Sequence, residues 1–377
     1  MSDRWFCDDT LLSAFELLEP SDLARLCLVS KHFYCLASSV LYRHVRLVGT
    51  VQSCESYCGI WDALVRRGEY PARYVRILEI DIRAAHGGRL HFPLTAVKFL
   101  SPALSNLHTL ALGEVFSAIL GVALVDVTFP CLRKLVIHQA ARGTEPFIAR
   151  HAGQITHMRL PLLNPQIMLR IPGCQVPSNC LHLEAMSLRL AQWACSTPCS
   201  LTYLAIFLCH MQPGGGFGIN ADLGRQLFTL LLQNAPNLQQ VRLVHFNCVP
   251  SLCAALKSLS DISLLSVRDV QVELGYPKLE ARSVINLLTP FSTLFPLMQT
   301  LRLIAMYCPD NVPQCPSFIV NLLGATATYL QTLQFGEQVY VRDEQVCDGG
   351  CVQSSNTSWR RASSHERPCK WPTILAE

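Results

Sequence analysis

The chain has 377 residues, of which 50% are hydrophobic and only 15% are charged. This composition excludes an intrinsically disordered protein, which is poor in apolar residues and rich in charge. The 31 Lys and Arg residues against 27 Asp and Glu leave a net charge of +4, which excludes the strongly basic class of nucleic-acid-binding proteins. The length predicts two or three domains, or one long repeat array.

The high apolar content raises the question of a membrane protein. A spanning helix needs about 20 consecutive apolar residues, and the best candidate stretches, 116–125 and 201–211, are shorter. The first residues carry neither the basic region nor the apolar region of a secretory signal. We therefore expect a soluble chain in the cytoplasm, the nucleus or both, which contacts neither a membrane nor nucleic acid.

The 18 cysteines include three pairs separated by three residues, namely Cys54/Cys58, Cys195/Cys199 and Cys347/Cys351. A zinc site usually combines two such pairs, or one pair and two histidines, within one small module. These pairs lie more than 100 residues apart. We expect free thiols, no metal site and no cofactor.

The first element in chain order is a compact helical module at residues 5–47. Leu11, Phe15 and Leu18 recur at helical spacing, and Pro20 suits the first position of a second helix. Phe33 and its apolar neighbours indicate a third helix. The apolar residues exceed what so small a core can bury, which predicts a surface for a partner.

This segment resembles an F-box, the module through which substrate receptors join SCF-type ubiquitin ligases. The residues that match the family pattern are Leu11, Phe15, Leu18, Pro20, Asp22, Leu23, Leu26, Val29, Ser30, Lys31, Phe33, Tyr34, Leu36 and Ala37. The departures are Phe6-Cys7 in place of Leu-Pro, Asp9 in place of Glu and Ala14 in place of Ile.

The resemblance implies a Skp-type adaptor as partner and, through it, a cullin ligase. The adaptor-binding residues that it implies are Phe6, Leu11, Phe15, Leu18, Pro20, Leu23, Leu26, Val29, Lys31, Phe33 and Leu36. Two alternatives stay open. The departures can make the F-box degenerate, so that it no longer assembles into a ligase, or the module can simply cap a repeat array.

A helical linker at residues 48–72 is expected to lead into a repeat region at 73–340. The template is L-x-x-L-x-L, whose last two apolar positions have the period of a strand with one buried face. It occurs ten times, at Val75/Leu78/Ile80, Leu107/Leu110/Leu112, Leu132/Leu135/Ile137, Ile155/Met158/Leu160, Leu183/Met186/Leu188, Leu201/Leu204/Ile206, Leu238/Val241/Leu243, Ile262/Leu265/Val267, Met298/Leu301/Leu303 and Leu330/Leu333/Phe335.

Helical stripes between the strands, at 222–234 and 283–295, complete a strand–helix unit. The predicted fold class is therefore an α/β repeat: a three-helix F-box-like module followed by an irregular leucine-rich-repeat solenoid with a curved parallel sheet. Leucine-rich repeats are also the usual companion of the F-box family. The spacing of the matches is irregular, so an ordinary α/β domain with parallel strands remains the alternative.

The residues interleaved with the second and third apolar positions are expected on the concave face of the solenoid. That face begins with Glu79 and Asp81, and no acidic residue follows at these positions in the predicted register. We predict a surface for an acidic or phosphorylated protein segment, because guanidinium groups pair bidentately with carboxylate and phosphate. Its arginines are Arg159, Arg189, Arg242, Arg268 and Arg302. The alternative is that these arginines only solvate an apolar sheet.

Residues 341–377 are rich in Ser, Arg and Cys and are predicted to be a disordered tail. No phosphate-binding loop, nucleophile elbow or zinc-protease motif is present in the sequence, so we expect a non-catalytic chain. The predicted function is substrate recognition within an SCF-type ligase. The alternative is a leucine-rich-repeat scaffold that has no ligase role.

Overall fold

The computed structural model describes residues 7–50, 71–83, 104–113, 126–138, 144–160, 178–185, 188–208, 210–211, 217–218, 221–245, 249–274, 281–305, 329–335, 338–343 and 358–361. The chain divides into two compact units, Met1–Pro177 and Ser178–Glu377. Each unit is described by itself below. No helix in the described ranges combines the length and the apolar character needed to cross a bilayer.

The first unit begins with three α-helices and continues into parallel strands. The helices are α1 (Asp8–Phe15), α2 (Pro20–Leu26) and α3 (Lys31–Leu41). The strands follow one another in the sheet in chain order, and they are β1 (His44–Thr50), β2 (Ile77–Arg83), β3 (Thr109–Leu112), β4 (Lys134–Ile137) and β5 (His157–Leu160). A 3₁₀ turn η2 (Ala72–Tyr74) precedes β2, and α7 (Thr144–His151) precedes β5.

The second unit repeats the same strand arrangement with more of its helices described. Its strands are β6 (His182–Ala185), β7 (Tyr203–Phe207), β10 (Gln240–His245), β11 (Asp269–Leu274), β12 (Thr300–Ala305), β13 (Thr332–Phe335), β14 (Gln338–Asp343) and β15 (Ser358–Arg361). Strands β6, β7, β10, β11, β12 and β13 pair in parallel, whereas β14 and β15 pair antiparallel. A separate small hairpin joins β8 (His210–Met211) to β9 (Phe217–Gly218).

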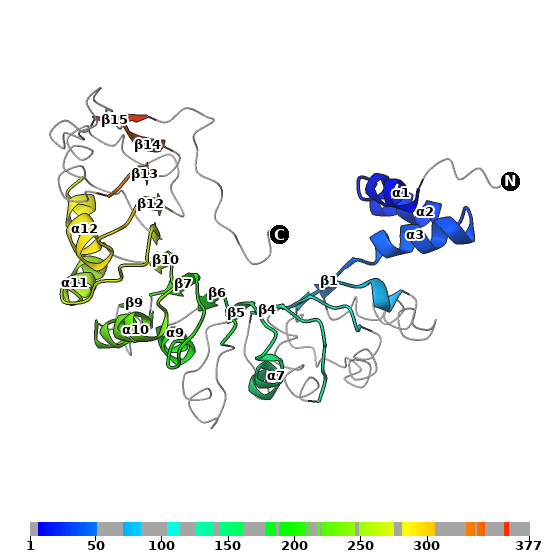
Figure 1. Ribbon diagram of the computed structural model, residues 1–377, viewed down its shortest axis with the longest axis horizontal. Coiled ribbons are helices and arrows are strands. Elements are labelled where there is room, and N and C mark those ends of the chain that lie inside the picture. Colours follow the sequence, from blue (N-terminus) through cyan, green and yellow to red (C-terminus); the bar gives the residue numbers. More distant parts are fainter. Residues whose placement is uncertain are drawn as a thin grey trace. The chain divides into compact units, whose positions relative to one another are not determined.

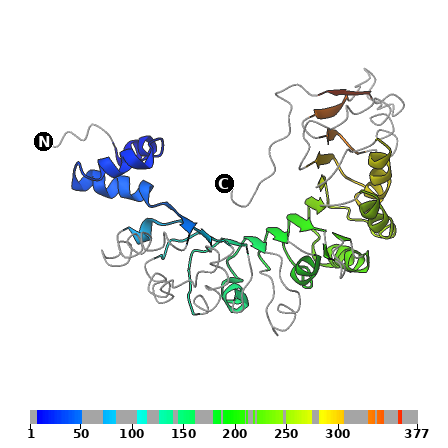
Figure 2. The same ribbon diagram turned by 180° about the vertical axis from the view of Figure 1, so that it is seen from behind.

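The helices of the second unit are α9 (Leu188–Ala194), α10 (Ala221–Asn234), α11 (Val249–Lys257) and α12 (Ala281–Leu294). They lie together on one side of the strands in both views (Figures 1 and 2). This order of parallel strand, connection and helix confirms the parallel sheet and the helices predicted at 222–234 and 283–295.

The buried core follows the predicted apolar positions in register from strand to strand. In the first unit Leu78 of β2 lies opposite Leu110 of β3, which lies opposite Leu135 of β4. In the second unit Leu204 lies opposite Val241, and the same column continues through later strands. These side chains are at most 3% exposed, and burial of each stabilises the fold by about 1.5–3 kcal/mol.

Two of the ten predicted strand positions were wrong in register, and eight were correct. At β6 the buried column is formed by Cys180, Leu183 and Ala185, so Leu188 lies in α9. At β11 it is formed by Val267, Val270 and Val272, whereas Leu265 of the predicted triplet is 60% exposed. In both places a second set of apolar residues at the same spacing competed with the correct one.

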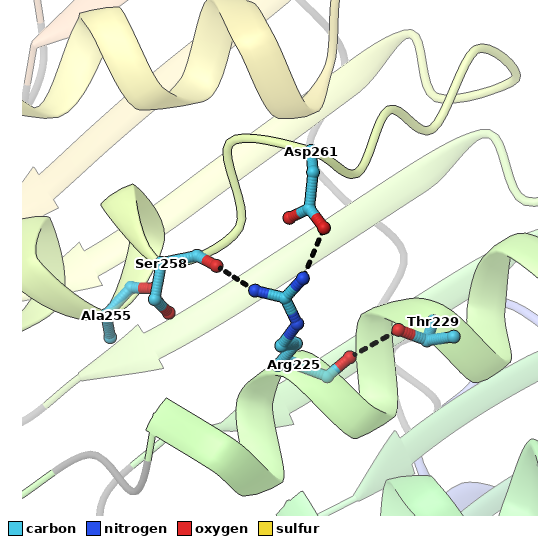
Figure 3. Close-up of polar contacts among 5 residues, drawn as sticks. All are labelled: Arg225, Thr229, Ala255, Ser258 and Asp261. Atoms are coloured by element: carbon cyan, nitrogen blue, oxygen red, sulfur yellow. Dashed lines mark hydrogen bonds and ion pairs between the residues drawn. The ribbon is translucent and has the colours of Figure 1, made fainter.

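Neighbouring repeats of the second unit are joined by side chains as well as by the sheet. Arg225 of α10 reaches past the end of α11, where it donates to the carbonyl of Ser258 at 3.0 Å and forms an ion pair with Asp261 (Figure 3). Ser258 in turn donates through Oγ to the carbonyl of Ala255 at 2.6 Å. A guanidinium at this position satisfies a carbonyl left without a partner at a helix C-terminus and complements the helix dipole.

Strands run across the predicted domain boundaries and into the predicted tail. Residues 44–47, at the end of the predicted helical module, form the start of β1 and pair in parallel with β2. Residues 358–361, predicted within a disordered tail, form β15 and pair with β14. Most of the predicted linker 48–72 and most of the tail 341–377 lie outside the described residues.

In the first unit a buried histidine, His151, joins helix α7 to the loop that contains Phe129. His151, the last residue of α7, is 0% exposed. Its Nδ1 donates to the carbonyl of Phe147 at 2.8 Å, and its Nε2 accepts from the backbone N–H of Phe129 at 2.9 Å. Burial lowers the pKa of His151 below its usual 6.5, because a protonated ring would lose both its hydration and the bond from Phe129.

We expect this histidine to make the first unit sensitive to acid. The unfolded His151 takes up a proton near pH 6.5, whereas the folded one stays neutral, so stability is complete above pH 6.5 and falls as the pH drops below it. The expected loss is about 1.4 kcal/mol for each pH unit within that window. Urea unfolding of the wild type and of His151→Gln at pH 7.5 and 5.5 measures it. Gln can keep both bonds but does not titrate, and an equal pH dependence in the two proteins would contradict the prediction.

Candidate functional site

The N-terminal three-helix module is defined by local sequence signals. Pro20 occupies the first turn of α2, where its missing N–H is not needed. Ser30 caps α3 by accepting the backbone N–H of Phe33 at 3.1 Å. Asp8 and Asp9 place negative charge in the first turn of α1, where it complements the helix dipole. The short helices therefore begin where the sequence favours a helix start.

The core of the module is small. Its fully buried hydrophobic side chains are Phe15, Leu23 and Ala37, one from each helix. The rings of Phe15 and Phe33 lie 5.7 Å apart at an interplanar angle of 44°. Partly buried residues complete this core, namely Leu11, Leu26, Cys27, Phe33, Leu36, Val40 and Leu41. Because so few residues are buried, we expect the stability of the module to depend on each of them.

Several large apolar side chains of the module face solvent. Leu17 and Leu18 lie between α1 and α2 and are 88% and 39% exposed, whereas Leu28 and Val29 lie between α2 and α3 and are 87% and 66% exposed. Tyr34 in the first turn of α3 is also exposed. We call Leu17, Leu18, Leu28, Val29 and Tyr34 the exposed apolar set. Because α2 has seven residues and is about 10 Å long, one partner surface can cover both of its ends.

The module also carries two exposed polar pairs. Arg43 pairs with Glu16 at 2.5 Å, and His32 Nε2 lies 3.2 Å from Asp8 Oδ1. Both pairs are about half exposed, so each stabilises the module by less than about 1 kcal/mol. Their arrangement suits an interface with an apolar centre and a polar rim.

The structure separates the predicted adaptor-binding residues into two groups. Leu18, Pro20, Val29 and Lys31 are exposed and available to a partner. The others belong to the core of the module, either fully buried, as Phe15 and Leu23 are, or packed against it: Leu11, Leu26, Phe33 and Leu36. Phe6 lies outside the described residues. Leu17 and Leu28 are not among the predicted residues, yet both are exposed. Their places outside the helical apolar stripes are the sequence signal for an exposed leucine.

The departures from the family pattern leave the fold of the module intact. Cys7, which replaces a proline, precedes α1 with φ −75°, within the range that proline itself imposes. Its Sγ lies 2.9 Å from Thr10 Oγ1, and this contact lowers the pKa of the thiol. Ala14, which replaces an isoleucine, is exposed and contributes nothing to the core. Neither substitution therefore removes a buried contact.

Comparison with known families agrees with this geometry. The family model named F-box-like matches residues 8–48. The chain contains an F-box-like domain. The match ends inside β1, so the domain passes directly into the first strand of the sheet. No curated protein matches the chain.

The predicted substrate-binding arginines do not form one row. Arg159, Arg242 and Arg302 do lie at interleaved strand positions. Arg189 instead lies in α9 and is exposed, and Arg268 precedes β11 and donates to the carbonyl of Leu297 at 3.0 Å. These two placements are corrections that follow from the register errors at β6 and β11.

Acidic residues lie at interleaved positions of β6 and β11. Glu184 lies beside Ala205 in the same row as Arg242, and Glu273 lies two residues beyond the partner of Arg242. Glu273 accepts from Arg242 Nε at 2.7 Å and from Nη2 at 2.9 Å. The expectation that this face lacks acidic residues after the first repeat was therefore wrong, and Arg242 is already neutralised within the chain.

The cysteine pair at 195 and 199 lies in the turn after α9. Cys199 donates through its N–H to the carbonyl of Asn234 at 2.8 Å, and Asn234 Nδ2 donates to the carbonyl of Cys195 at 2.8 Å. The hydrogen bond between the two thiols lowers the pKa of Cys199 to about 7 and raises that of Cys195. In the described part of the chain no group of three or more His, Cys, Asp or Glu residues could hold a metal ion. The other two cysteine pairs, 54/58 and 347/351, lie outside it.

Proposed function

We propose that this chain is the substrate-recognition subunit of an SCF-type cullin ubiquitin ligase. The F-box-like domain binds a Skp-type adaptor, and the strand–helix region binds the protein to be modified. The chain supplies proximity between that protein and the catalytic subunits and performs no chemistry itself. A cytoplasmic or nuclear location fits this role.

The observation that supports adaptor binding is the exposed apolar set of the F-box-like domain. Burial of a leucine side chain stabilises a complex by about 1.5–3 kcal/mol, and Leu17 and Leu28 are almost fully exposed here. A stable interface covers about 800 Å² of each partner. The two ends of α2, with the helix between them, are compatible with an area of that size.

The repeat geometry supports an irregular leucine-rich-repeat solenoid for the remainder. Within each unit the parallel strands keep their buried positions in register, and each strand begins with the same pattern. The carbonyl before one strand accepts two successive N–H groups of the next, as the carbonyl of Thr202 does from Gln239 and Gln240. Such units bury their apolar face only against neighbours, which leaves the other face of the strands for a protein ligand.

The second candidate is a leucine-rich-repeat scaffold with no ligase role. The departures at Cys7 and Ala14 favour it, because Ala14 presents less apolar surface to an adaptor than isoleucine would. The two candidates differ in one measurable property, which is the affinity of the chain for a Skp-type adaptor.

We expect Leu17→Glu/Leu28→Glu to abolish adaptor binding without unfolding the domain. Two carboxylates would replace apolar contact area, and the expected affinity loss is at least about a hundredfold. Co-expression of the full chain with the adaptor, followed by size-exclusion chromatography and calorimetry, measures it. Leu232→Glu/Leu265→Glu is the matched control, since those leucines are 50% and 60% exposed in the second unit.

Variants of the core cannot answer this question. Leu23 is 4% exposed within the core of the module, so Leu23→Asp is expected to unfold the domain and to lose binding for that reason. A wild-type chain that does not bind the adaptor at micromolar concentration would favour the scaffold. Equal adaptor binding by the Leu17/Leu28 variant and the control would contradict the proposed surface.

A further inference from the structure

A row of basic side chains marks the starts of β2, β3 and β4 in the first unit. Arg76, His108 and Arg133 each precede one of these strands. The carbonyl of Arg76 accepts the N–H of His108, and that of His108 accepts the N–H of Arg133, both at 2.8 Å. The three residues are therefore successive neighbours across the sheet, about 4.8 Å apart. We call them the basic edge.

The basic edge is accessible to a ligand. Arg76 and Arg133 are exposed, and His108 is half-buried. Within the described ranges neither arginine side chain makes a hydrogen bond or an ion pair. His108 Nδ1 donates to the carbonyl of Asn106 at 2.6 Å, so Nε2 of the neutral ring is an acceptor and the two arginines supply the donors of the edge. Asn106 also donates to the carbonyl of Arg73 at 2.8 Å and so holds a further arginine near this edge.

The same position elsewhere in the chain shows that the fold does not require these charges. Before β1 the residue is Arg43, which pairs with Glu16. In the second unit the equivalent residues are mostly neutral: Leu181, Thr202, Gln239, Arg268, Gln299 and Gln331. Arg268 alone is cationic there, and it donates to a carbonyl of its own unit. Arg76 and Arg133 carry like charges two strands apart and repel one another, which a bound anion would relieve.

The size of the edge limits the anion. Glu79 of β2, three residues after Arg76, binds His44 and Arg46 at 3.1 Å each and borders the basic edge with negative charge. Three residues about 4.8 Å apart span only about 10 Å. This length fits one compact dianion, because guanidinium groups bind phosphate oxygens bidentately. A nucleic-acid strand, which carries its charge along the whole backbone, needs a longer basic stripe.

We propose that the basic edge binds a phosphorylated side chain within a peptide segment of a protein partner. The inference deepens the proposed function by naming the class of substrate, and it places recognition on the first unit. Arg76 and Arg133 bind the phosphate from either side, and His108 lies between them. The remainder of the peptide makes its contacts along the neighbouring strands.

The test uses the full chain immobilised on a sensor surface, without the adaptor, so that its outcome is independent of adaptor binding. The probes are a short peptide with one phosphoserine in a neutral background, its unphosphorylated form and its Glu form. We expect the phosphopeptide to bind at least about tenfold more tightly than either. Arg76→Ala/Arg133→Ala is expected to remove that preference. The charge-matched control Arg25→Ala/Lys257→Ala, which changes exposed residues of α2 and α11, should keep it.

Three results would overturn the inference. The first is equal affinity for the phosphorylated and Glu peptides. The second is an unchanged preference in Arg76→Ala/Arg133→Ala, with circular dichroism showing that this variant is folded. The third is tighter binding of a single-stranded oligonucleotide than of the phosphopeptide, which would assign the edge to nucleic acid. Loss of adaptor binding in the separate assay would leave all three readouts unaffected.

Discussion

Glu273→Ala should destabilise the second unit more than any other change of a single charged residue considered for this chain, by about 3–5 kcal/mol. The Glu273 carboxylate is 7% exposed and accepts two hydrogen bonds from Arg242, whose side chain is 20% exposed. It also accepts from Gln271 Nε2. The substitution leaves a guanidinium in a poorly hydrated position between strands, with no carboxylate to balance it.

The cost of leaving Arg242 without its partner can be measured separately from the net contribution of the Arg242–Glu273 ion pair to stability. Burial alone would lower the pKa of Arg242, whereas the hydrogen bonds and charge of Glu273 raise it above its usual range. Without Glu273 the guanidinium still stays charged, because an arginine side chain is not deprotonated in proteins. Replacing both residues in Arg242→Leu/Glu273→Leu removes the stranded charge. That double variant is expected to recover most of the stability, within about 1–2 kcal/mol of the wild type.

Denaturant unfolding of the wild type, Arg242→Leu, Glu273→Leu and the double variant measures the coupling, and that of Glu273→Ala measures the loss. Glu16→Ala is the control, because it breaks an ion pair of similar geometry whose side chains are about half exposed. The expected loss there is below about 1 kcal/mol. If Glu273→Ala cost no more than Glu16→Ala, the pair between β10 and β11 would be a surface contact in solution.

The strands that could be predicted from the sequence are those whose apolar residues are large and flanked by polar ones. At β3 and β4 the triplets of leucines and isoleucine give one possible register. At β6 the buried column uses Cys180 and Ala185, whose small side chains gave no signal, while Met186 and Leu188 offered a stronger false one. A local sequence pattern shows which residues are apolar. It does not show which of two overlapping apolar triplets becomes buried when the strand pairs with its neighbours.

The same limit explains the errors at the candidate sites. The family pattern identified the F-box-like domain, but its conserved spacing mixes residues that hold the module together with residues that a partner would touch. Leu23 and Val29 both match the pattern, and only the folded module shows that the first is buried and the second exposed. The pairing of Arg242 with Glu273 joins residues 31 positions apart, which no local spacing could predict.

The strand register also determines how the second unit should respond to a cavity. Leu301 of β12 is 0% exposed and lies between Val270 of β11 and Leu333 of β13. Leu301→Ala is expected to cost about 2–5 kcal/mol through lost burial and the cavity left behind. The exposed Leu232→Ala in α10 is the matched control, with an expected change below about 0.5 kcal/mol.

The distribution of that loss distinguishes a solenoid from an α/β domain with a single core. In a solenoid each repeat contacts only its neighbours, so stability is a sum of local terms. Hydrogen exchange measured by mass spectrometry should then show that Leu301→Ala reduces protection mainly in β11, β12 and β13 and leaves β7 close to its wild-type protection. A single cooperative core would lose protection together in all of these strands. A uniform loss from β7 to β13 would therefore contradict the solenoid, and a graded loss centred on β12 would support it.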